Sequence, residues 1–205
     1  MMLHGVLDFE GGKNFPESER MCGELADMGY YAEYIEYYSQ VGLFWKWLAE
    51  IHSGLDALGK NPAVDPDRVA LMGFSLGAFL ALSTGARDPK HVAAIVEYYG
   101  GLLPSISDGA KTMPPTLILH GDKDVVVPVA MAHSLNELLT KYKRRHEMKI
   151  YEGANHTFNF PAEGTWYNSA DARDAWNRSA KFLAENLGAG PHGALSSSRS
   201  LCDLR

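Results

Sequence analysis

Residues Val69–Leu82 read VALMGFSLGAFLAL and place one serine between two glycines in an otherwise almost wholly apolar stretch. Gly73, Ser75 and Gly77 form the pattern G-x-S-x-G, with a strand-like apolar run before it and a helix-like apolar run after it. A strand that reverses abruptly into a helix brings two backbones close together, so side chains flanking the serine would clash. Two interpretations are open at this point. Ser75 is either a small residue in a tight buried turn or a nucleophile held in a strained conformation above a sheet.

The rest of the chain alternates between strand-like runs and helical periodicities. Strands are expected over residues 1–4, 30–37, 69–74, 92–98, 116–120 and 148–151. Helices are expected over residues 16–28, 43–58, 76–86, 129–139 and 172–187. This alternation predicts an α/β fold, a mostly parallel sheet with helices on both faces and ligands at the carboxyl ends of its strands. Residues 1–187 are expected to form one domain, and the Gly- and Ser-rich residues 188–205 a disordered tail.

Composition excludes several classes of partner. The chain has 205 residues, 46% of them hydrophobic and 21% charged, with a formal net charge of −6. An acidic surface does not attract phosphates, so neither nucleic acid nor an anionic membrane is expected as a partner. The N-terminal stretch has no basic region followed by a long apolar core, and no apolar run approaches membrane-spanning length, which makes a cytoplasmic protein the expectation. Neither of the two cysteines has metal-ligand spacing.

A serine nucleophile needs a base, and the base needs an orienting acid. In a fold of this kind they follow the serine in the order Asp or Glu, then His, on loops after later strands. The strand at 116–120 leads into the loop that contains Asp124, and the strand at 148–151 leads into the loop that contains His156. Asp122 is a local rival to Asp124, and His120, at a strand end, is expected to be structural. Each residue alone has an ordinary explanation as a loop residue, but their order and placement together predict a triad.

Acyl transfer also requires donors for the oxyanion of the tetrahedral intermediate. One is expected to be the backbone N–H of Leu76, at the start of the helix after the serine, where the helix dipole assists. The other is expected to be the N–H of Val6, in the loop after the first strand. Ester chemistry with these groups requires no metal and no organic cofactor.

Over residues 2–187 the sequence resembles the α/β-hydrolase superfamily and, within it, the dienelactone hydrolase family. The segments that carry the resemblance are LHG, ELADMGYYAEYIEYY, GFSLGAF, HGDKDVVVP, YEGANHTFNF and AWNRSAKFL. Residue by residue, the resemblance implies a triad of Ser75, Asp124 and His156 with oxyanion donors at Val6 and Leu76. It implies a carboxylic ester hydrolase that needs no cofactor.

Three departures from the family pattern bear on the substrate. Ser75 stands where enzymes of dienelactone have cysteine, and Gly5 stands where they have glutamate. Those enzymes bind a substrate carboxylate with arginines, whereas no arginine lies between Arg145 and Arg173. A small neutral ester is therefore expected rather than an acidic one. Aromatic side chains are expected to wall its pocket: Tyr37, Tyr38, Phe74 and Trp166.

Two structural expectations follow from the resemblance. The short connection between the strands at 92–98 and 116–120 leaves no room for a cap domain. The superfamily's first two strands have no counterpart ahead of residues 1–4, so the strand at 30–37 is expected to be an uncovered edge. Two hypotheses follow: the protein pairs with a second copy through that edge, or it is a shortened form of a longer protein. Two other functions stay open: a catalytically silent hydrolase fold used for binding, and a serine peptidase of the prolyl oligopeptidase type, which HGDKDVVVP also resembles.

Overall fold

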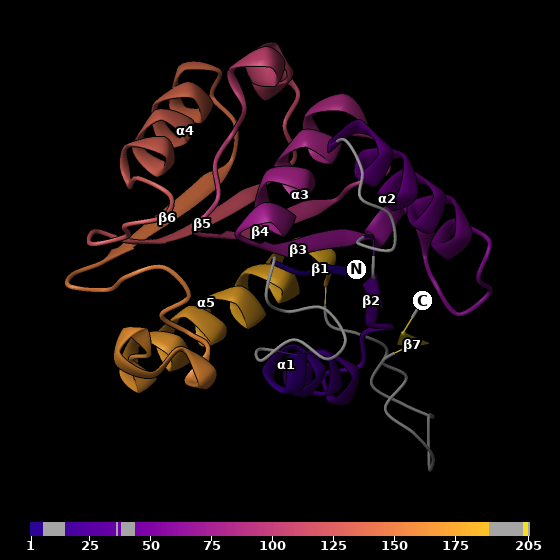
Figure 1. Ribbon diagram of the computed structural model, residues 1–205. Coiled ribbons are helices and arrows are strands. Elements are labelled where there is room, and N and C mark those ends of the chain that lie inside the picture. Colours follow the sequence, from indigo (N-terminus) through magenta and orange to yellow (C-terminus); the bar gives the residue numbers. More distant parts are fainter. Residues whose placement is uncertain (6–14, 36, 38–43, 189–202, 205) are drawn as a thin grey trace.

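A computed structural model describes residues 1–5, 15–35, 37, 44–188 and 203–204 of the chain. In this part of the chain, seven strands form one sheet in the order β6-β5-β4-β3-β1-β2-β7, and every neighbouring pair is parallel (Figure 1). The strands are β1 (Met2–Leu3), β2 (Glu33–Ile35), β3 (Ala70–Phe74), β4 (Ala94–Tyr98), β5 (Thr116–Gly121), β6 (His146–Tyr151) and β7 (Asp203–Leu204). The helices are α1 (Phe15–Asp27), α2 (Phe44–Gly59), α3 (Leu76–Arg87), α4 (Ala130–Lys141) and α5 (Ser169–Leu187).

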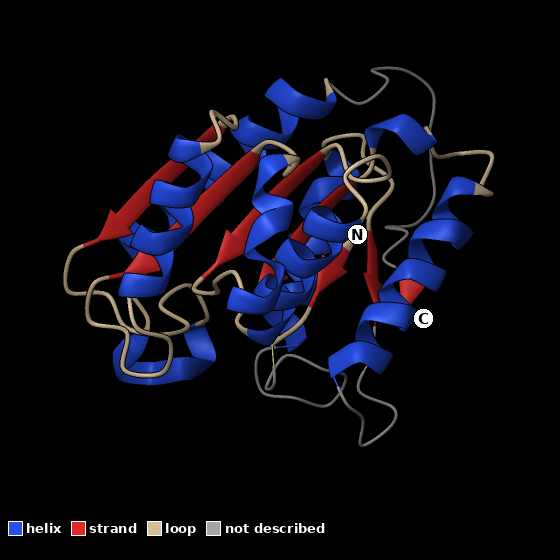
Figure 2. Cartoon of the chain, turned by 90° about the horizontal axis from the view of Figure 1, so that it is seen from above, coloured by secondary structure: helices blue, strands red, loops and turns tan. Residues whose placement is uncertain are grey.

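The helices cover both faces of the sheet. Figure 1 shows α1 and α5 on one face and α2, α3 and α4 on the other, and Figure 2 shows the strands side by side across the molecule. Each face has its own buried cluster: Tyr34, Val96 and Phe182 belong to one, and Ile51, Leu80 and Ile118 to the other. Because both faces are covered, the central strands β3 and β4 are buried along their whole length. The expected α/β fold with a parallel sheet is confirmed.

The edge of the sheet beside β2 differs from the expectation of an uncovered strand. The backbone of Asp203–Leu204 pairs in parallel with Glu33 and Tyr34. An extended strand with unpaired N–H and C=O groups is a template for any second extended segment, and here a segment from the C-terminal part of the chain occupies it. Within the tail that the sequence predicted to be disordered, residues 203–204 form strand β7. Residues 189–202 and 205 lie outside the described residues.

The connections between the described elements include three 3-10 helices. Between β4 and β5 the described chain forms only a 3-10 helix, η2 (Pro104–Lys111), with loops on either side of it. Two further 3-10 helices, η1 (Pro66–Arg68) and η3 (Pro161–Trp166), precede β3 and α5. Among the described residues, no helix is both long enough and apolar enough to cross a membrane.

Candidate active site

Ser75 occupies a sharp turn between β3 and α3. Its backbone has φ 51° and ψ −115°, a conformation that L-residues seldom adopt, and its N–H donates to the carbonyl of Tyr98 at 3.0 Å. The flanking glycines are required by space. A Cβ at Gly73 would lie 2.3 Å from the carbonyl oxygen of Gly77, and a Cβ at Gly77 would lie 2.2 Å from that of Leu3. The turn therefore holds the serine in a strained conformation at the carboxyl edge of the sheet.

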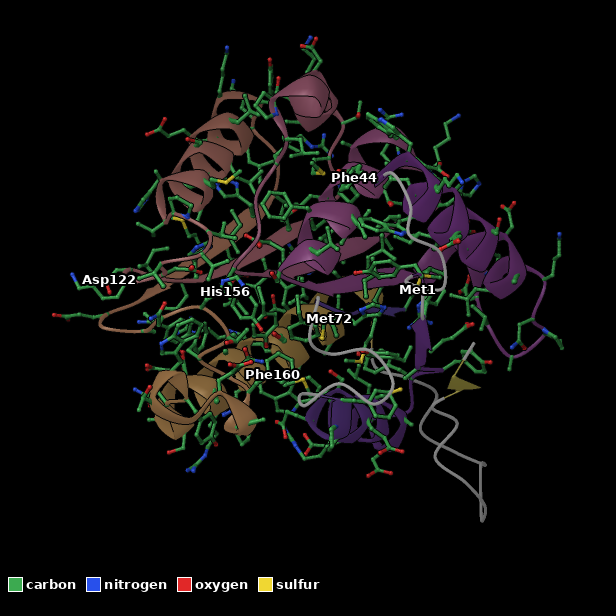
Figure 3. The ribbon with its side chains drawn as sticks, viewed as in Figure 1. Met1, Phe44, Met72, Asp122, His156 and Phe160 are labelled. Atoms are coloured by element: carbon green, nitrogen blue, oxygen red, sulfur yellow. The ribbon has the colours of Figure 1, made fainter. Side chains whose placement is uncertain are left out.

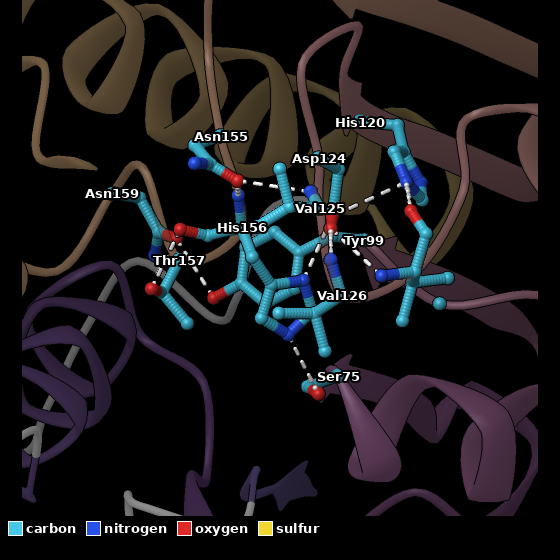
Figure 4. A network of polar contacts seen from close by, with 12 residues as sticks. Ser75, Tyr99, His120, Asp124, Val125, Val126, Asn155, His156, Thr157 and Asn159 are labelled. Atoms are coloured by element: carbon cyan, nitrogen blue, oxygen red, sulfur yellow. Dashed lines mark hydrogen bonds and ion pairs between the residues drawn. The ribbon is translucent and has the colours of Figure 1, made fainter.

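A chain of hydrogen bonds joins Ser75 to two residues that lie far from it in sequence (Figure 4). His156 Nε2 lies 2.9 Å from Ser75 Oγ, and His156 Nδ1 lies 2.7 Å from Asp124 Oδ2. A carboxylate only accepts, so Nδ1 carries the proton that faces Asp124, and Nε2 is left with a lone pair toward the serine hydroxyl. The structure thus brings together the three residues that the sequence predicted as a triad.

Asp124 is held by four donors. Its Oδ1 accepts from the N–H groups of Val126 at 2.8 Å and Val127 at 2.7 Å, and its Oδ2 faces His156 and, at 3.3 Å, His120 Nε2. Burial by itself would raise the pKa of the Asp124 carboxyl. The hydrogen bonds from His120, His156 and Val127 outweigh burial and hold that pKa well below its ordinary value. Asp124 is therefore a carboxylate at neutral pH.

The structure distinguishes between the two aspartates of this loop. Asp122 Oδ1 accepts from the backbone N–H of Gly153 at 2.7 Å, and its side chain lies near Lys123. Figure 3 shows Asp122 at the periphery of the molecule, whereas His156 lies toward its middle. Asp122 thus ties two loops together, and Asp124 is the one that reaches the histidine.

Two neighbours of His156, Tyr99 and Asn155, were not anticipated from the sequence. The Tyr99 ring packs against the imidazole with centroids 4.6 Å apart, and the Tyr99 hydroxyl donates to Asn159 Oδ1 at 2.8 Å. Tyr99 has φ 44°, so its backbone is also in the left-handed region. Asn155 Oδ1 accepts from the N–H groups of His156 at 2.7 Å and Val125 at 3.1 Å, which joins the histidine loop to the aspartate loop. A polar residue directly before the predicted histidine is the one signal that the sequence offered.

The other predicted site residues lie as follows. Leu76 is the first residue of α3, so its N–H has no acceptor within the helix and is available to a ligand. Val6 and Tyr38 lie outside the described residues. Tyr37 and Phe74 are fully buried. The Tyr37 hydroxyl donates to the His4 carbonyl, and its ring stacks on the His4 ring. The Phe74 ring packs against Tyr98 and Phe160. Trp166 is half-buried at the end of η3.

Two cavities of about 320 and 310 Å³ lie away from this constellation. The first is lined by Met1, Arg68 and Leu187, among others, and the second lies between α1 and α5, with Arg20 and Trp176 in its lining. In the part of the chain that the structure describes, none of the triad residues lines either cavity, and no three His, Cys, Asp or Glu side chains are grouped as metal ligands.

Comparison with known proteins places this chain in a family. A model of the dienelactone hydrolase family matches residues 41–187. A Synechocystis sp. protein named "Putative carboxymethylenebutenolidase" is 32% identical over 152 residues, which cover 68% of this chain and 61% of that protein. Acyl-protein thioesterase 1 of Saccharomyces cerevisiae is 30% identical over 104 residues, which cover 47% of this chain and 46% of that protein. The chain thus spans about three fifths of the Synechocystis relative and less than half of the yeast one.

Solved structures give the same fold. The dienelactone hydrolase-like promiscuous phosphotriesterase P91, from metagenomic libraries, superimposes with a TM-score of 0.73 at 22% sequence identity, covering 90% of this chain and 84% of that one. At this identity the likeness concerns the fold alone, and that fold is the α/β-hydrolase fold. Strand order, elbow and family match agree, and the chain belongs to the dienelactone hydrolase family of the α/β-hydrolase superfamily.

Proposed function

We propose that the protein is a serine carboxylic ester hydrolase that cleaves small neutral esters through an acyl-enzyme intermediate. The observation that carries this proposal is the unbroken chain of hydrogen bonds from Asp124 through His156 to Ser75, with the serine on a strained elbow. A serine in a merely structural turn has no need of an imidazole acceptor 2.9 Å away that is itself oriented by a carboxylate.

The first half of the reaction acylates Ser75. His156 Nε2 takes the proton from Ser75 Oγ as Oγ forms a bond to the ester carbonyl carbon, whose oxygen becomes an oxyanion. The N–H of Leu76 stabilises that oxyanion, together with a second donor that we place at Val6. When the tetrahedral intermediate collapses, the bond between the carbonyl carbon and the alkoxy oxygen breaks, and His156 gives its proton to the leaving alcohol.

The second half releases the acid. Water loses a proton to His156 Nε2 while its oxygen attacks the acyl carbon, and collapse of this intermediate breaks the bond to Ser75 Oγ, which takes the proton back. Throughout both halves Asp124 stays ionised, fixes the tautomer of His156 and stabilises the imidazolium when it forms. The depressed pKa of Asp124 fits this role.

A neutral substrate is proposed because of the side chains around the triad. In the described residues, the triad is hydrogen-bonded to His120, Asn155 and backbone N–H groups, without arginine or lysine among these partners. A substrate carboxylate would therefore find no arginine or lysine among the described hydrogen-bond partners of the triad. Relatives named carboxymethylenebutenolidase act on a lactone according to their name, and a lactone is a cyclic ester, so a neutral lactone belongs in the same substrate screen.

The test is covalent labelling with a fluorophosphonate, followed by peptide mass spectrometry to locate the modified residue. We expect the label on Ser75, and loss of labelling in His156→Ala. His133→Ala is the matched control, because His133 is exposed on α4 and should leave labelling unchanged. A folded protein that takes no label on Ser75 would contradict the proposal and favour a binding role for this fold. Cleavage of peptides but not of esters would favour the peptidase alternative.

A further inference from the structure

Two buried ionisable residues lie beneath the elbow and take no part in the reaction described above. Glu97 is on β4 and His120 is on β5, and both side chains are fully buried. Glu97 pairs in register with Gly73 of β3 and Ile118 of β5, and alternation along β5 puts His120 on the same face of the sheet as Ile118. This is the face that α3 covers, because Ile95 and Ile118 share their buried cluster with Leu80.

Each of these residues uses one polar atom and leaves the other without a hydrogen-bond partner. Glu97 Oε2 accepts from the backbone N–H of Gly100 at 2.8 Å, and Glu97 Oε1 has no partner in the described structure. His120 Nε2 lies 2.9 Å from the Val127 carbonyl and 3.3 Å from Asp124 Oδ2, and His120 Nδ1 has no partner in the described structure. Buried polar atoms without partners are rare enough to need a reason.

The tautomer of His120 follows from its contacts. A carbonyl oxygen only accepts, so Nε2 must carry a proton and donate it toward Val127 and Asp124. Nδ1 then carries a lone pair in the neutral ring and a proton in the imidazolium. In the first case it can accept from a protonated Glu97, and in the second it can donate to a Glu97 carboxylate, in each case through one bridging water, because no direct hydrogen bond joins the two atoms in the described structure. In either case Glu97 and His120 would hold one proton between them.

We propose that Glu97 and His120 form a proton-sharing pair that positions Asp124, and through it His156, from beneath the elbow. The pair touches the triad directly at the contact between His120 Nε2 and Asp124 Oδ2. Glu97 also fixes the turn at Gly100, directly after Tyr99, whose ring packs on His156. Glu97 and His120 are therefore positioning residues. Their role in catalysis rests on the proposed esterase function.

The electrostatics of the two groups agree with this geometry. Burial raises the pKa of Glu97 to about 7, against the charge of His120 and the N–H of Gly100, which lower it. Burial would lower the pKa of His120, but the hydrogen bond to Asp124, the charge of Glu97 and the Val127 carbonyl together raise it. Among the described residues, the charges that act on His120 are thus Glu97 and Asp124, and Asp124 in turn faces His156.

The direction of the effect on catalysis can be worked out. When the shared proton lies on His120, its positive charge offsets part of the negative charge of Asp124, so Asp124 stabilises the His156 imidazolium less. Glu97→Gln keeps an acceptor for Gly100 but removes the carboxylate that supports the charge of His120, which then stays neutral in its buried position. The imidazolium of His156 is then more stable. The acid limb of the kcat/KM profile should therefore move to higher pH, by about half a unit to one unit.

The experiment measures kcat/KM for p-nitrophenyl acetate against pH in four proteins: the native chain, Glu97→Gln, His120→Gln and the double variant. We expect the acid limb to move upward in both single variants and Glu97→Gln to add nothing in the His120→Gln background, because Glu97 acts through His120. Glu33→Gln is the matched control, since Glu33 is also a buried strand glutamate but lies on β2, and its profile should superimpose on the native one. An unmoved acid limb in Glu97→Gln, or a shift that persists without His120, would overturn the proposal.

A second measurement does not depend on activity or on the folding of a variant. Nitrogen-15 NMR of the imidazoles of the native protein should show His120 protonated at Nε2 across the whole pH range, with titration at Nδ1. A dominant Nδ1–H tautomer at high pH would rule out the shared proton. If the native protein takes no fluorophosphonate on Ser75, the proposed esterase function fails. The tautomer of His120 would still test whether Glu97 and His120 share a proton.

Discussion

At the scale of single residues, the elbow shows how two glycines and one strained serine depend on each other. Adding a Cβ at Gly77 would place it 2.2 Å from the Leu3 carbonyl, which belongs to the backbone of β1 and cannot rotate away. Gly77→Ala should therefore lower the free energy of unfolding by about 1–3 kcal/mol through overpacking and should displace Ser75. Chemical denaturation and the rate of fluorophosphonate labelling check this together. Gly23→Ala on α1, where a Cβ meets nothing within 4 Å, is the control that should be neutral or stabilising.

The depressed pKa of Asp124 makes the stability of the fold depend on pH. Its pKa is depressed in the folded state, so it contributes stability that is present above its ordinary pKa and is lost as pH falls through the folded-state pKa. The native protein should lose roughly 2 kcal/mol from this group as the pH falls below about 4, and Asp124→Asn should lack that part of the acid sensitivity. Thermal denaturation at a series of pH values measures it. Asp122→Asn is the control, and equal acid sensitivity in the native protein and Asp124→Asn would contradict the account.

At the scale of secondary-structure elements, the edge strand β2 offers a test of assembly. β7 pairs with Glu33 and Tyr34 on the outer side of β2, so a second copy can add to that edge only after β7 leaves. We propose that removal of residues 203–205 opens the edge and promotes dimers through β2. Light scattering over a range of protein concentrations should show dimer in the shortened chain and less of it in the full chain. A shortened chain that stays monomeric at all concentrations would exclude edge pairing.

At the scale of the whole molecule, net charge bears on the neutral substrate that we propose. The formal net charge of −6 repels anionic esters over distances comparable with the Debye length. For a matched pair of esters with and without a carboxylate, kcat/KM should be lower for the anionic one, and the difference should narrow as salt is added. Steady-state kinetics at low and high ionic strength measures both effects. Faster turnover of the anionic ester at low salt would instead point to a cationic subsite.

The sequence predicted the elements of this molecule because their signals are local. Apolar periodicity and stop residues predicted the helices, and α1 and α2 begin and end within one or two residues of the expected positions. The strand expected at 30–37 is shorter in the structure, at Glu33–Ile35, because strand length depends on pairing with a neighbour rather than on β-propensity alone. The family match confirmed the resemblance to the dienelactone hydrolase family that the motifs indicated.

What the sequence by itself determined was the elbow, the order of Ser75, Asp124 and His156, and the parallel α/β fold. Each of these follows from residue spacing along the chain. Only the tertiary structure decided that Asp124 rather than Asp122 meets His156, that Tyr99 packs on the imidazole, and that Glu97 and His120 lie on one face beneath the elbow. Those contacts join different strands and loops, so they depend on strand order and register, and a local pattern carries no information about which distant residue will lie opposite.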